Sequence, residues 1–430
     1  MAKPVHIGLL GLGTVGSGVV RILQENRASI LERAGRPLEL RRILVRDLHK
    51  KRAVSVSPDL LTTSPADLLD DPEIEVIVEV MGGVEPARQY LAEALRRRKH
   101  VVTANKELIA KEGHPLLDLA TRSGVFFLFE ASVAGGIPIV KALRDSLAAN
   151  RISQLMGIIN GTTNYILTRM ARDGSSFEEA LREAQARGYA EADPSSDVDG
   201  YDAAYKLVIL ASLAFGTRVP VERVYIEGIR SVTPVDIAYA RELGYVVKLL
   251  AIGKDLGESV QLRVHPTLIP QEHPLAAVSD VYNAVFIEGN AVGQLMFYGR
   301  GAGDLPTGSA VVADLIEVAR HLERGPVIPA CSCYTQKPLL PMGKVTSQFY
   351  LRMEVLDKPG VLARIAGAFG EAEVSLASVI QKGRGIQPVT LVFVTHEVAE
   401  ENLRRALDQI RRLPCVHAIK NVIRVEGERP

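Results

Sequence analysis

The chain has 430 residues, 47% of them hydrophobic, which is enough for two or three domains that each bury a core. Its 51 basic and 50 acidic residues leave a net charge of +1, which argues against partners such as nucleic acids and anionic membranes. The longest apolar runs are much shorter than the roughly 20 residues that span a bilayer, and the first residues do not resemble a signal peptide. Three cysteines in so long a chain argue against a disulfide framework, so we expect a cytoplasmic protein.

The first part of the chain alternates short apolar runs with stretches of helical spacing. The apolar runs cover residues 4–10, 38–45, 74–83, 100–107 and 124–132. After the first run, apolar residues recur at helical spacing as far as Gly35, which is typical of a helix C-terminus. Because alternating strands and helices are typical of an α/β fold, we predict a Rossmann-type, doubly wound parallel sheet over residues 1–132.

A glycine-rich turn joins the first strand to the first helix. Its glycines, Gly11, Gly13 and Gly16, form the pattern GxGxxG. In a dinucleotide-binding turn the first glycine allows a tight bend, the second admits the pyrophosphate, and the third lets the helix pack closely. The pattern alone is weak, but its place between strand and helix predicts a cofactor site that includes Thr14 and Val15. The alternative is a tight turn that binds nothing.

The residues after the second strand, VRDLHKKR, bear on the choice of cofactor. An acidic residue here would bind the ribose 2′-hydroxyl of NAD, whereas Arg46 could pair with the 2′-phosphate of NADP. Basic residues surround the single acidic residue, Asp47. We therefore predict NADP, with NAD as an alternative.

Lys106 and Glu130 also follow predicted strands of this sheet. Lys106 belongs to TANKELIA, at a place where side chains face the ligand crevice, although an ordinary surface lysine is the simpler interpretation. Glu130 begins an irregular turn, EASVAGGIP, whose carboxylate and carbonyl oxygens suit a hard cation. One carboxylate is too few to predict calcium, so spacing alone leaves the cation site a minor alternative.

The pattern changes beyond residue 132. Amphipathic stretches mix with alternating strands, which predicts a separate α+β domain over residues 133–307. Its expected helices are residues 135–149, 176–187, 200–215 and 234–244. A further helix near residues 308–324 is expected to pack back on the first domain.

The last part of the chain begins with a proline-rich stretch. Residues 325–346 are predicted to form a linker, and their Cys331 and Cys333 lack the neighbouring histidine or cysteine that a metal site would need. Residues 347–430 then follow the order βαββαβ, which is the ferredoxin-like arrangement.

The segment GYAEADPSSDVDGYDAAYKL, residues 188–207, places several carboxylates ahead of Lys206. It partly matches a calcium-binding EF-hand loop, but Lys206 stands where that loop needs a bidentate glutamate, so this interpretation fails. A surface ion pair between Asp202 and Lys206 is a simple alternative, although the residues around them are apolar. A site for an amino acid fits better, because carboxylates bind an ammonium group and a lysine donates a proton to a developing alkoxide. Loop structure and solvation are expected for the other aspartates, Asp193, Asp197 and Asp199.

Six motifs, in this order and spacing, resemble those of homoserine dehydrogenases. They are GLGTVG, TANKELIA, EASVAGGIPIV, NGTTNYIL, GYAEADPSSDVDGYDAAYKL and GRGAGDLPTGSAVVADL, and they cover residues 5–320. Residues 347–430 resemble an ACT domain, a small module that binds amino acids, with its usual ligand loop at Asp357–Leu362. The resemblance implies NAD(P)-dependent interconversion of L-aspartate 4-semialdehyde and L-homoserine on the branch to threonine and methionine. Feedback inhibition, commonly by threonine, and a homodimer or homotetramer are also implied. Residues 133–307 would then be the substrate-binding, catalytic and dimerisation domain.

The resemblance also implies roles for individual residues. Lys206 matches the proton donor, and Lys106 matches a second lysine near the nicotinamide and the substrate. Glu191 and Asp202 match the substrate-binding carboxylates. Further implied cofactor contacts are Thr103, Gly188 and Gly303. The implied sodium ligands are Glu130 and the backbone of Val133, Gly135 and Ile137.

Two other classes of function remain open. An amino-acid dehydrogenase that releases ammonia would need an imine-forming site, and assays with homoserine and with aspartate distinguish it. A non-catalytic amino-acid sensor on a dehydrogenase scaffold is the other alternative. The intact lysines and carboxylates of the motifs argue against a sensor.

Overall fold

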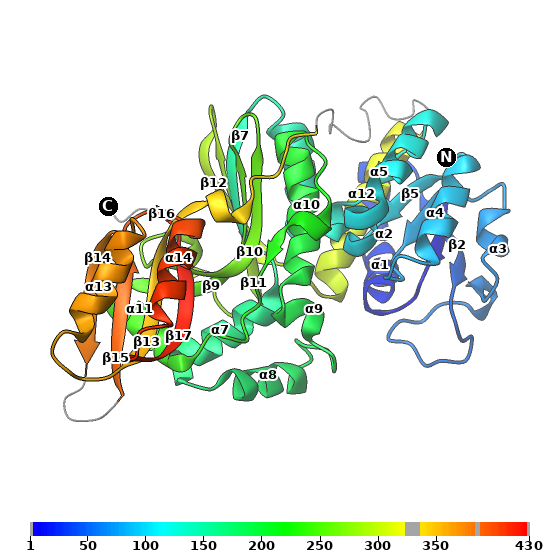
Figure 1. Ribbon diagram of the computed structural model, residues 1–430. Coiled ribbons are helices and arrows are strands. Elements are labelled where there is room, and N and C mark those ends of the chain that lie inside the picture. Colours follow the sequence, from blue (N-terminus) through cyan, green and yellow to red (C-terminus); the bar gives the residue numbers. More distant parts are fainter. Residues whose placement is uncertain (1–2, 323–335, 383–387, 428–430) are drawn as a thin grey trace. The chain divides into compact units, whose positions relative to one another are not determined.

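The structure, a computed structural model, describes residues 3–322, 336–382 and 388–427 (Figure 1). It divides into two compact units. The first comprises Met1–Leu155, Asp202–Val224 and Tyr282–Lys337, and the second comprises Met156–Tyr201, Tyr225–Val281 and Pro338–Pro430. None of the helices in the described ranges is long and apolar enough to cross a membrane.

The first unit contains the predicted parallel sheet, with its strands in the order β3-β2-β1-β4-β5-β6. The strands are β1 (Val5–Leu10), β2 (Leu38–Leu44), β3 (Leu61–Thr62), β4 (Val76–Glu79), β5 (His100–Thr103) and β6 (Phe127–Leu128). The predicted doubly wound α/β fold is confirmed. The strand order reverses between β1 and β4, so the carboxyl ends of these two strands border the crevice in which such folds bind ligands. The predicted apolar runs 74–83, 100–107 and 124–132 are longer than the strands β4, β5 and β6 that they contain, because the last residues of each run form the loops around this crevice.

Helices cover the sheet, and one of them is interrupted. They are α1 (Thr14–Glu25), α2 (Arg27–Ala34), α3 (Ala66–Leu69), α4 (Ala87–Arg96) and α5 (Lys106–Ser123), with a 3₁₀ turn η1 (Pro58–Leu60). The sequence predicted a single helix up to Gly35, but Asn26, at φ −103° and ψ 17°, divides it into α1 and α2. The predicted end is correct, because Gly35 caps α2 with a φ of 77°.

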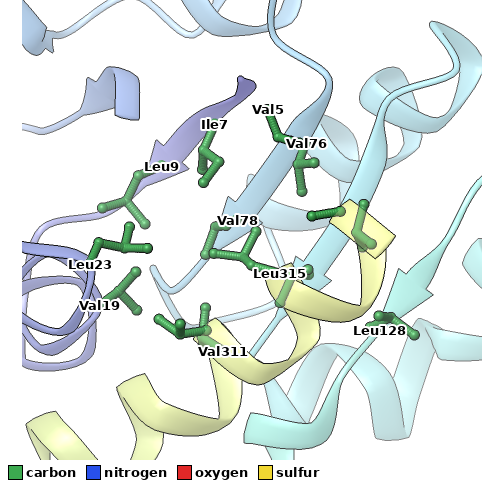
Figure 2. Close-up of a cluster of buried hydrophobic side chains, with 14 of the residues drawn as sticks. Val5, Ile7, Leu9, Val19, Leu23, Val76, Val78, Leu128, Val311 and Leu315 are labelled. Carbon is green, nitrogen blue, oxygen red and sulfur yellow. The ribbon is translucent and has the colours of Figure 1, made fainter. Parts of the chain in front are cut away.

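Helix α12 (Asp304–His321) returns to this sheet from late in the sequence. It packs on α1 at Gly18, where a Cβ atom would lie 2.0 Å from the carbonyl oxygen of the first residue of α12. Val311 and Leu315 enter the same core as Val78 of β4 (Figure 2). The contact needs a glycine, because any side chain at position 18 would push the two helices apart.

The first unit also holds the elements that carry the site. They are η2 (Glu130–Ser132), α6 (Ile139–Lys141), the π-helical turn η3 (Ala142–Ser146), α10 (Tyr201–Phe215), η4 (Val221–Arg223) and the antiparallel hairpin of β11 (Tyr282–Gly289) and β12 (Gly293–Arg300). Strand β7 (Ile152–Ile158) continues into the second unit. The predicted helix 135–149 begins only at Ile139, because Ala134 and Gly135 have positive φ angles of 53° and 30°. Left-handed residues cannot continue a right-handed helix.

The second unit begins with an α+β region. Its elements are α7 (Gly161–Asp173), α8 (Phe177–Ala186), α9 (Ser195–Val198), β8 (Tyr225–Ile226), α11 (Pro234–Glu242), β9 (Tyr245–Asp255), β10 (Val260–Pro270) and η5 (Pro274–Ala277). The predicted helices at 176–187 and 234–244 are found as α8 and α11. Each begins at a capping box, which explains why the sequence located their starts well.

The same unit ends with the predicted βαββαβ arrangement. Its elements are β13 (Thr346–Val355), α13 (Val361–Glu371), β14 (Leu376–Lys382), β15 (Val389–Thr395), β16 (Val398–Ala399), α14 (Glu400–Ile410) and β17 (Val416–Val425). The sheet order is β17-β13-β15-β14, and α13 and α14 contribute to one core with its strands. The ferredoxin-like prediction is confirmed.

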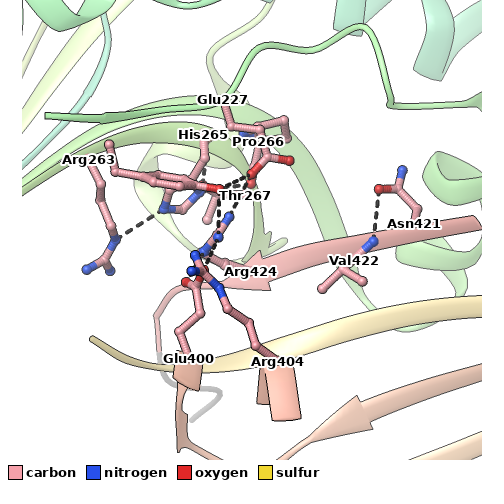
Figure 3. A network of polar contacts seen from close by, with 11 residues as sticks. Glu227, Arg263, His265, Pro266, Thr267, Glu400, Arg404, Asn421, Val422 and Arg424 are labelled. Atoms are coloured by element: carbon pink, nitrogen blue, oxygen red, sulfur yellow. Dashed lines mark hydrogen bonds and ion pairs between the residues drawn. The ribbon is translucent and has the colours of Figure 1, made fainter. Parts of the chain in front are cut away.

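This βαββαβ region is joined to the α+β region by sheet pairing and buried charges. Strand β17 pairs in parallel with β10, where Arg424 stands opposite Thr267. The guanidinium of Arg424 donates to Glu400 at 2.8 and 2.9 Å, to Glu227 at 2.9 Å and to the hydroxyl of Tyr225 at 3.0 Å (Figure 3). A buried charge stripped of its partners is strongly destabilising, so this geometry favours one fixed arrangement of the two regions.

The predicted linker, residues 325–346, lies outside the described residues as far as residue 335, and so do Cys331 and Cys333. In its described part, the backbone N–H of Leu340 donates to the carbonyl of Val260 at 2.8 Å. The turn η6 (Met342–Lys344) then leads into β13.

Candidate active site

The glycine turn after β1 has the geometry of a dinucleotide-binding turn. Gly11 has a φ of 105°, which permits the tight bend. A Cβ atom on Gly16 would lie 2.3 Å from the carbonyl oxygen of Gly11, so only glycine lets α1 pack this closely. Apart from Gly13 and its chain neighbours, no residue in the described part of the chain comes within 4 Å of the corresponding position on Gly13, and no described side chain caps α1. Open space at an uncapped helix N-terminus fits a pyrophosphate.

The loop after β2 leaves Arg46 exposed and uses Asp47 for its own structure. The Asp47 carboxylate accepts the backbone N–H of His49 at 2.8 Å. Arg52 donates to the carbonyls of Leu48 and Lys50 at 3.2 and 2.8 Å. The loop is therefore held by Asp47 and Arg52, and Arg46 lies exposed beside the end of β2.

A buried carboxylate lies between two lysines in the first unit. Asp202 accepts from the Nζ of Lys206 at 2.6 Å and from the Nζ of Lys106 at 2.8 Å, each with a different oxygen. The side chains of Lys206 and Asp202 are only 9% and 4% exposed, whereas that of Lys106 is 42% exposed. The interpretation of Asp202 and Lys206 as a surface ion pair is therefore wrong, and Lys106 is not an isolated surface lysine.

The charges of this cluster depend on one another. Burial alone would raise the pKa of Asp202, but the ammonium groups of Lys206 and Lys106 outweigh it and hold the pKa well below its usual value. Asp202 stays ionised as a result. Both of its oxygens contact lysines in the structure, and its predicted task of binding substrate stays a prediction.

Local structure explains how the sequence brings these three residues together. Lys106 is the first residue of α5, and the side chain of Asn105 caps that helix by accepting the N–H of Leu108 at 3.1 Å. Asp202 and Lys206 lie one turn apart on α10, whose other buried residues are nearly all apolar. Burying two charged groups in an apolar helix costs free energy of folding unless they pair with each other or bind a ligand.

The predicted cofactor contact of Thr103 stays a prediction, and the structure shows what its side chain bonds to within the protein. It is fully buried, and its hydroxyl donates to Glu79 at 2.6 Å and accepts the N–H of Asn105 at 3.0 Å. Sequence reasoning missed Glu79, although a carboxylate that ends the otherwise apolar strand VIVE before two glycines is a usable signal.

Gly188 and Glu191 belong to the second unit. Gly188 has a φ of 74° just after α8, and Glu191 is exposed on the loop that follows. Their predicted contacts with cofactor and substrate stay predictions, as does that of Gly303, which precedes α12 with a φ of 126°.

The neighbouring aspartates organise the same loop, as expected. Asp197 accepts from the side chains of Asn160 and Thr162 at 2.7 and 3.1 Å. Asp199 pairs with Arg230. Asp193 accepts the N–H of Ser195 at 3.1 Å. These contacts tie the loop to the start of α7 and to the segment after β8.

At the turn of Glu130, backbone carbonyl oxygens are better placed to bind a cation than the Glu130 carboxylate is. The two carboxylate oxygens of Glu130 accept the N–H groups of Val140 and Lys141 at 2.9 and 2.6 Å, so they cap α6. Burial raises the pKa of Glu130, and these two N–H groups oppose the rise. Val133 and Gly135 are buried, and no hydrogen bond within the described chain reaches their carbonyl oxygens. Unsatisfied carbonyls of this kind fit a hard cation.

Comparisons with known families agree with this geometry. The family model "Homoserine dehydrogenase, NAD binding domain" matches residues 11–130, "Homoserine dehydrogenase" matches residues 138–316, and "ACT domain" matches residues 349–415. The homoserine dehydrogenase of Synechocystis sp. is 50% identical over 434 residues, covering 98% of this chain and 99% of its own. That of Bacillus subtilis is 44% identical and covers 99% of both.

Solved structures give the same result. A homoserine dehydrogenase from Thiobacillus denitrificans has a TM-score of 0.94 at 46% identity, with 99% of this chain and 98% of that chain covered. A hyperthermophilic archaeal homoserine dehydrogenase in complex with NADPH has a TM-score of 0.63 at 28% identity and covers 75% of this chain and 99% of its own. The present chain therefore belongs to the homoserine dehydrogenase family, as an oxidoreductase that acts on the CH–OH group of homoserine and carries a C-terminal ACT domain.

Proposed function

We propose that Lys206 transfers the proton in the interconversion of L-aspartate 4-semialdehyde and L-homoserine. The observation that carries this proposal is the burial of Lys206 against Asp202, with Lys106 on the other carboxylate oxygen. When bound, the nicotinamide cofactor supplies the hydride for the carbonyl carbon of the semialdehyde. The electron pair of the carbonyl bond then moves to the oxygen, and Lys206 donates a proton to the resulting alkoxide.

The neighbouring residues support this proton transfer in different ways. Asp202 orients both lysines and keeps a negative charge beside them, which favours the protonated form that donates. Lys106 adds a second positive charge that favours the alkoxide. In homoserine oxidation the neutral amine of Lys206 accepts the hydroxyl proton, so oxidation should speed up as pH rises. Glu191 is our candidate for the substrate ammonium group.

One experiment tests the reaction and the cofactor together. Purified protein is assayed for homoserine oxidation with NAD and with NADP, each with and without threonine. Homoserine-dependent formation of reduced cofactor is expected with both, faster with NADP, and threonine is expected to slow it. A protein that forms reduced cofactor with aspartate and not with homoserine would contradict the proposal.

The NADP preference rests on Arg46. Arg46→Ala should raise the KM for NADP about tenfold or more and leave the KM for NAD nearly unchanged, because a hydrogen bond between charged groups contributes roughly 1.5–3 kcal/mol. Lys50→Ala, on the same exposed loop, is the matched control and should change neither constant much. Equal losses with both cofactors would contradict a role for Arg46 in reading the 2′-phosphate.

A structural sodium ion is proposed at the turn of Glu130. Its ligands would be the carbonyl oxygens of Glu130, Val133, Gly135 and Ile137. The uncompensated carbonyls of Val133 and Gly135 support the site, and Ala134 with its positive φ lets the turn bend around a small ion. Replacing sodium by choline at constant ionic strength should lower the unfolding midpoint by several degrees, because an ion that binds only the folded state stabilises it. An unchanged midpoint in choline would contradict the site.

Regulation is proposed to act through the ACT domain. Its loop Asp357–Leu362 contains Gly360, which precedes α13 with a φ of 85°, and no side chain caps that helix. The first N–H groups of α13 therefore suit the carboxylate of an amino-acid effector such as threonine. We further propose a cytoplasmic homodimer or homotetramer, with the domain division 1–132, 133–307, 325–346 and 347–430.

A further inference from the structure

Glu79 is a fully buried carboxylate beside the ligand crevice. It is the last residue of β4, and it pairs in register with Leu10 at the end of β1 and with Thr103 at the end of β5. A charged side chain in the middle of a parallel sheet is costly to bury without several hydrogen bonds. The hydrogen-bond donors around Glu79 therefore indicate its role.

Two loops of the crevice donate to this carboxylate. The backbone N–H groups of Met81 and Gly82, in the loop after β4, donate to one oxygen at 2.8 and 3.2 Å. The hydroxyl of Thr103, the last residue of β5 and the start of the second loop, donates to the other oxygen at 2.6 Å. Asn105 approaches the first oxygen at 3.5 Å. The two backbone N–H groups can only donate, so the first oxygen must accept, and the Thr103 hydroxyl, which can donate or accept, completes the arrangement at the second oxygen.

The second of these loops ends at Lys106. The Thr103 hydroxyl that donates to Glu79 also accepts the N–H of Asn105 at 3.0 Å. Asn105 in turn donates to the carbonyl of Gly83 at 2.6 Å and caps α5, whose first residue is Lys106. In the motif TANK, the threonine and the asparagine therefore shape the turn, and the lysine alone reaches the cluster.

We propose that Glu79 is a positioning residue that holds the loop after β4 and the start of α5 in one arrangement, so that Lys106 meets Asp202. The inference rests on the proposed role of Lys106 in the reaction. Burial raises the pKa of Glu79, and the hydroxyl, amide and backbone donors oppose that rise. In the present arrangement the carboxylate accepts on both oxygens; a proton on the oxygen that faces Met81 and Gly82 would meet two donors, whereas a proton on the other oxygen could be donated to the Thr103 hydroxyl.

Glu79→Gln tests this arrangement, because an amide can accept with only one of its two terminal atoms. Its NH₂ would either clash with the N–H groups of Met81 and Gly82 or face Thr103, whose hydroxyl would then accept and lose the acceptor of its own proton. The variant should lower kcat about tenfold to a hundredfold with little change in the KM for homoserine, since a small displacement of a catalytic group costs this much. Glu75→Gln is the matched control. Glu75 lies at the amino end of the same strand, away from the crevice, and accepts the N–H of His6. This variant should therefore stay near wild type.

A double-mutant cycle separates positioning of Lys106 from a general structural role. If Glu79 acts through Lys106, Glu79→Gln should slow the wild-type enzyme and should slow a Lys106→Met enzyme by less than about twofold. Equal slowing in both backgrounds, or no slowing of the wild type, overturns the inference. Near-normal turnover of Lys106→Met alone would instead refute the proposed role of Lys106.

A second pair of variants keeps the test valid if Glu79→Gln folds poorly. Thr103→Val removes the hydroxyl at nearly constant shape, and Thr103→Ser keeps it. Hydrogen exchange should increase at residues 80–84 and 104–109 in Thr103→Val and not in Thr103→Ser, with the β1–α1 segment unchanged in both. Unchanged exchange at residues 104–109 in the valine variant would also overturn the inference.

Discussion

Lys206→Met should lower kcat for homoserine oxidation by about a thousandfold, because general acid–base catalysis by a positioned group typically contributes 10²–10⁴-fold. Methionine keeps the buried aliphatic stem of the lysine and removes the amine that exchanges the proton. The proposed cofactor site lies at the turn after β1 and the loop after β2, so the affinity for NADPH should change little. Steady-state rates and a fluorescence titration with NADPH measure the two effects separately.

The matched control for this variant is Lys111→Met. Lys111 also pairs with a carboxylate one helical turn away, Glu107, but the side chains of this pair are each 34% exposed. It should keep near-normal turnover, because an exposed pair contributes little and takes no part in the reaction. Turnover of Lys206→Met within about tenfold of wild type would remove Lys206 from proton transfer, since even the weakest general catalysis exceeds that factor.

The sequence predicted the architecture well where local signals were strong. The glycines at the turn after β1 and the capping boxes of α8 and α11 each determine a local structure that tertiary packing then keeps. The sequence predicted less well where backbone geometry depends on distant partners. Asn26 interrupts a continuous amphipathic pattern. The residues before Ile139 form a turn, although the spacing of their apolar residues favours a helix.

The candidate site shows the same limit at the level of single residues. Motif spacing identified Lys106, Asp202 and Lys206, but only the packing of α5 and α10 shows that one carboxylate serves both lysines. The resemblance implies that Thr103 contacts the cofactor, and this stays a prediction. The hydrogen-bond partner of its side chain, Glu79, lies 24 positions earlier, so this hydrogen bond leaves no mark in the local pattern.

Asp202→Asn should lower kcat for homoserine oxidation about a hundredfold and should move the acid limb of its pH profile to lower pH. The rate falls because the amide no longer holds two ammonium groups in place. The limb moves because oxidation needs the neutral amine of Lys206, and loss of the adjacent negative charge lets that amine release its proton at lower pH. An opposite charge at this distance typically shifts a titration by about 1–3 pH units.

The same variant changes how stability depends on pH, and the sign follows from the carboxyl group. The pKa of Asp202 is lower in the folded protein than in the unfolded chain, so its stabilising contribution is present above about pH 4 and is lost as pH falls toward the folded pKa. Urea unfolding between about pH 5 and 2 should therefore show a smaller loss of unfolding free energy in Asp202→Asn than in wild type. At neutral pH the variant should be less stable by about 3–5 kcal/mol, because two ammonium groups have lost their buried partner. Adding Lys206→Met should recover part of this stability, since it removes the less exposed of the two charges. An unshifted acid limb together with wild-type acid unfolding would refute the assignment of Asp202 as the anion that governs both lysines.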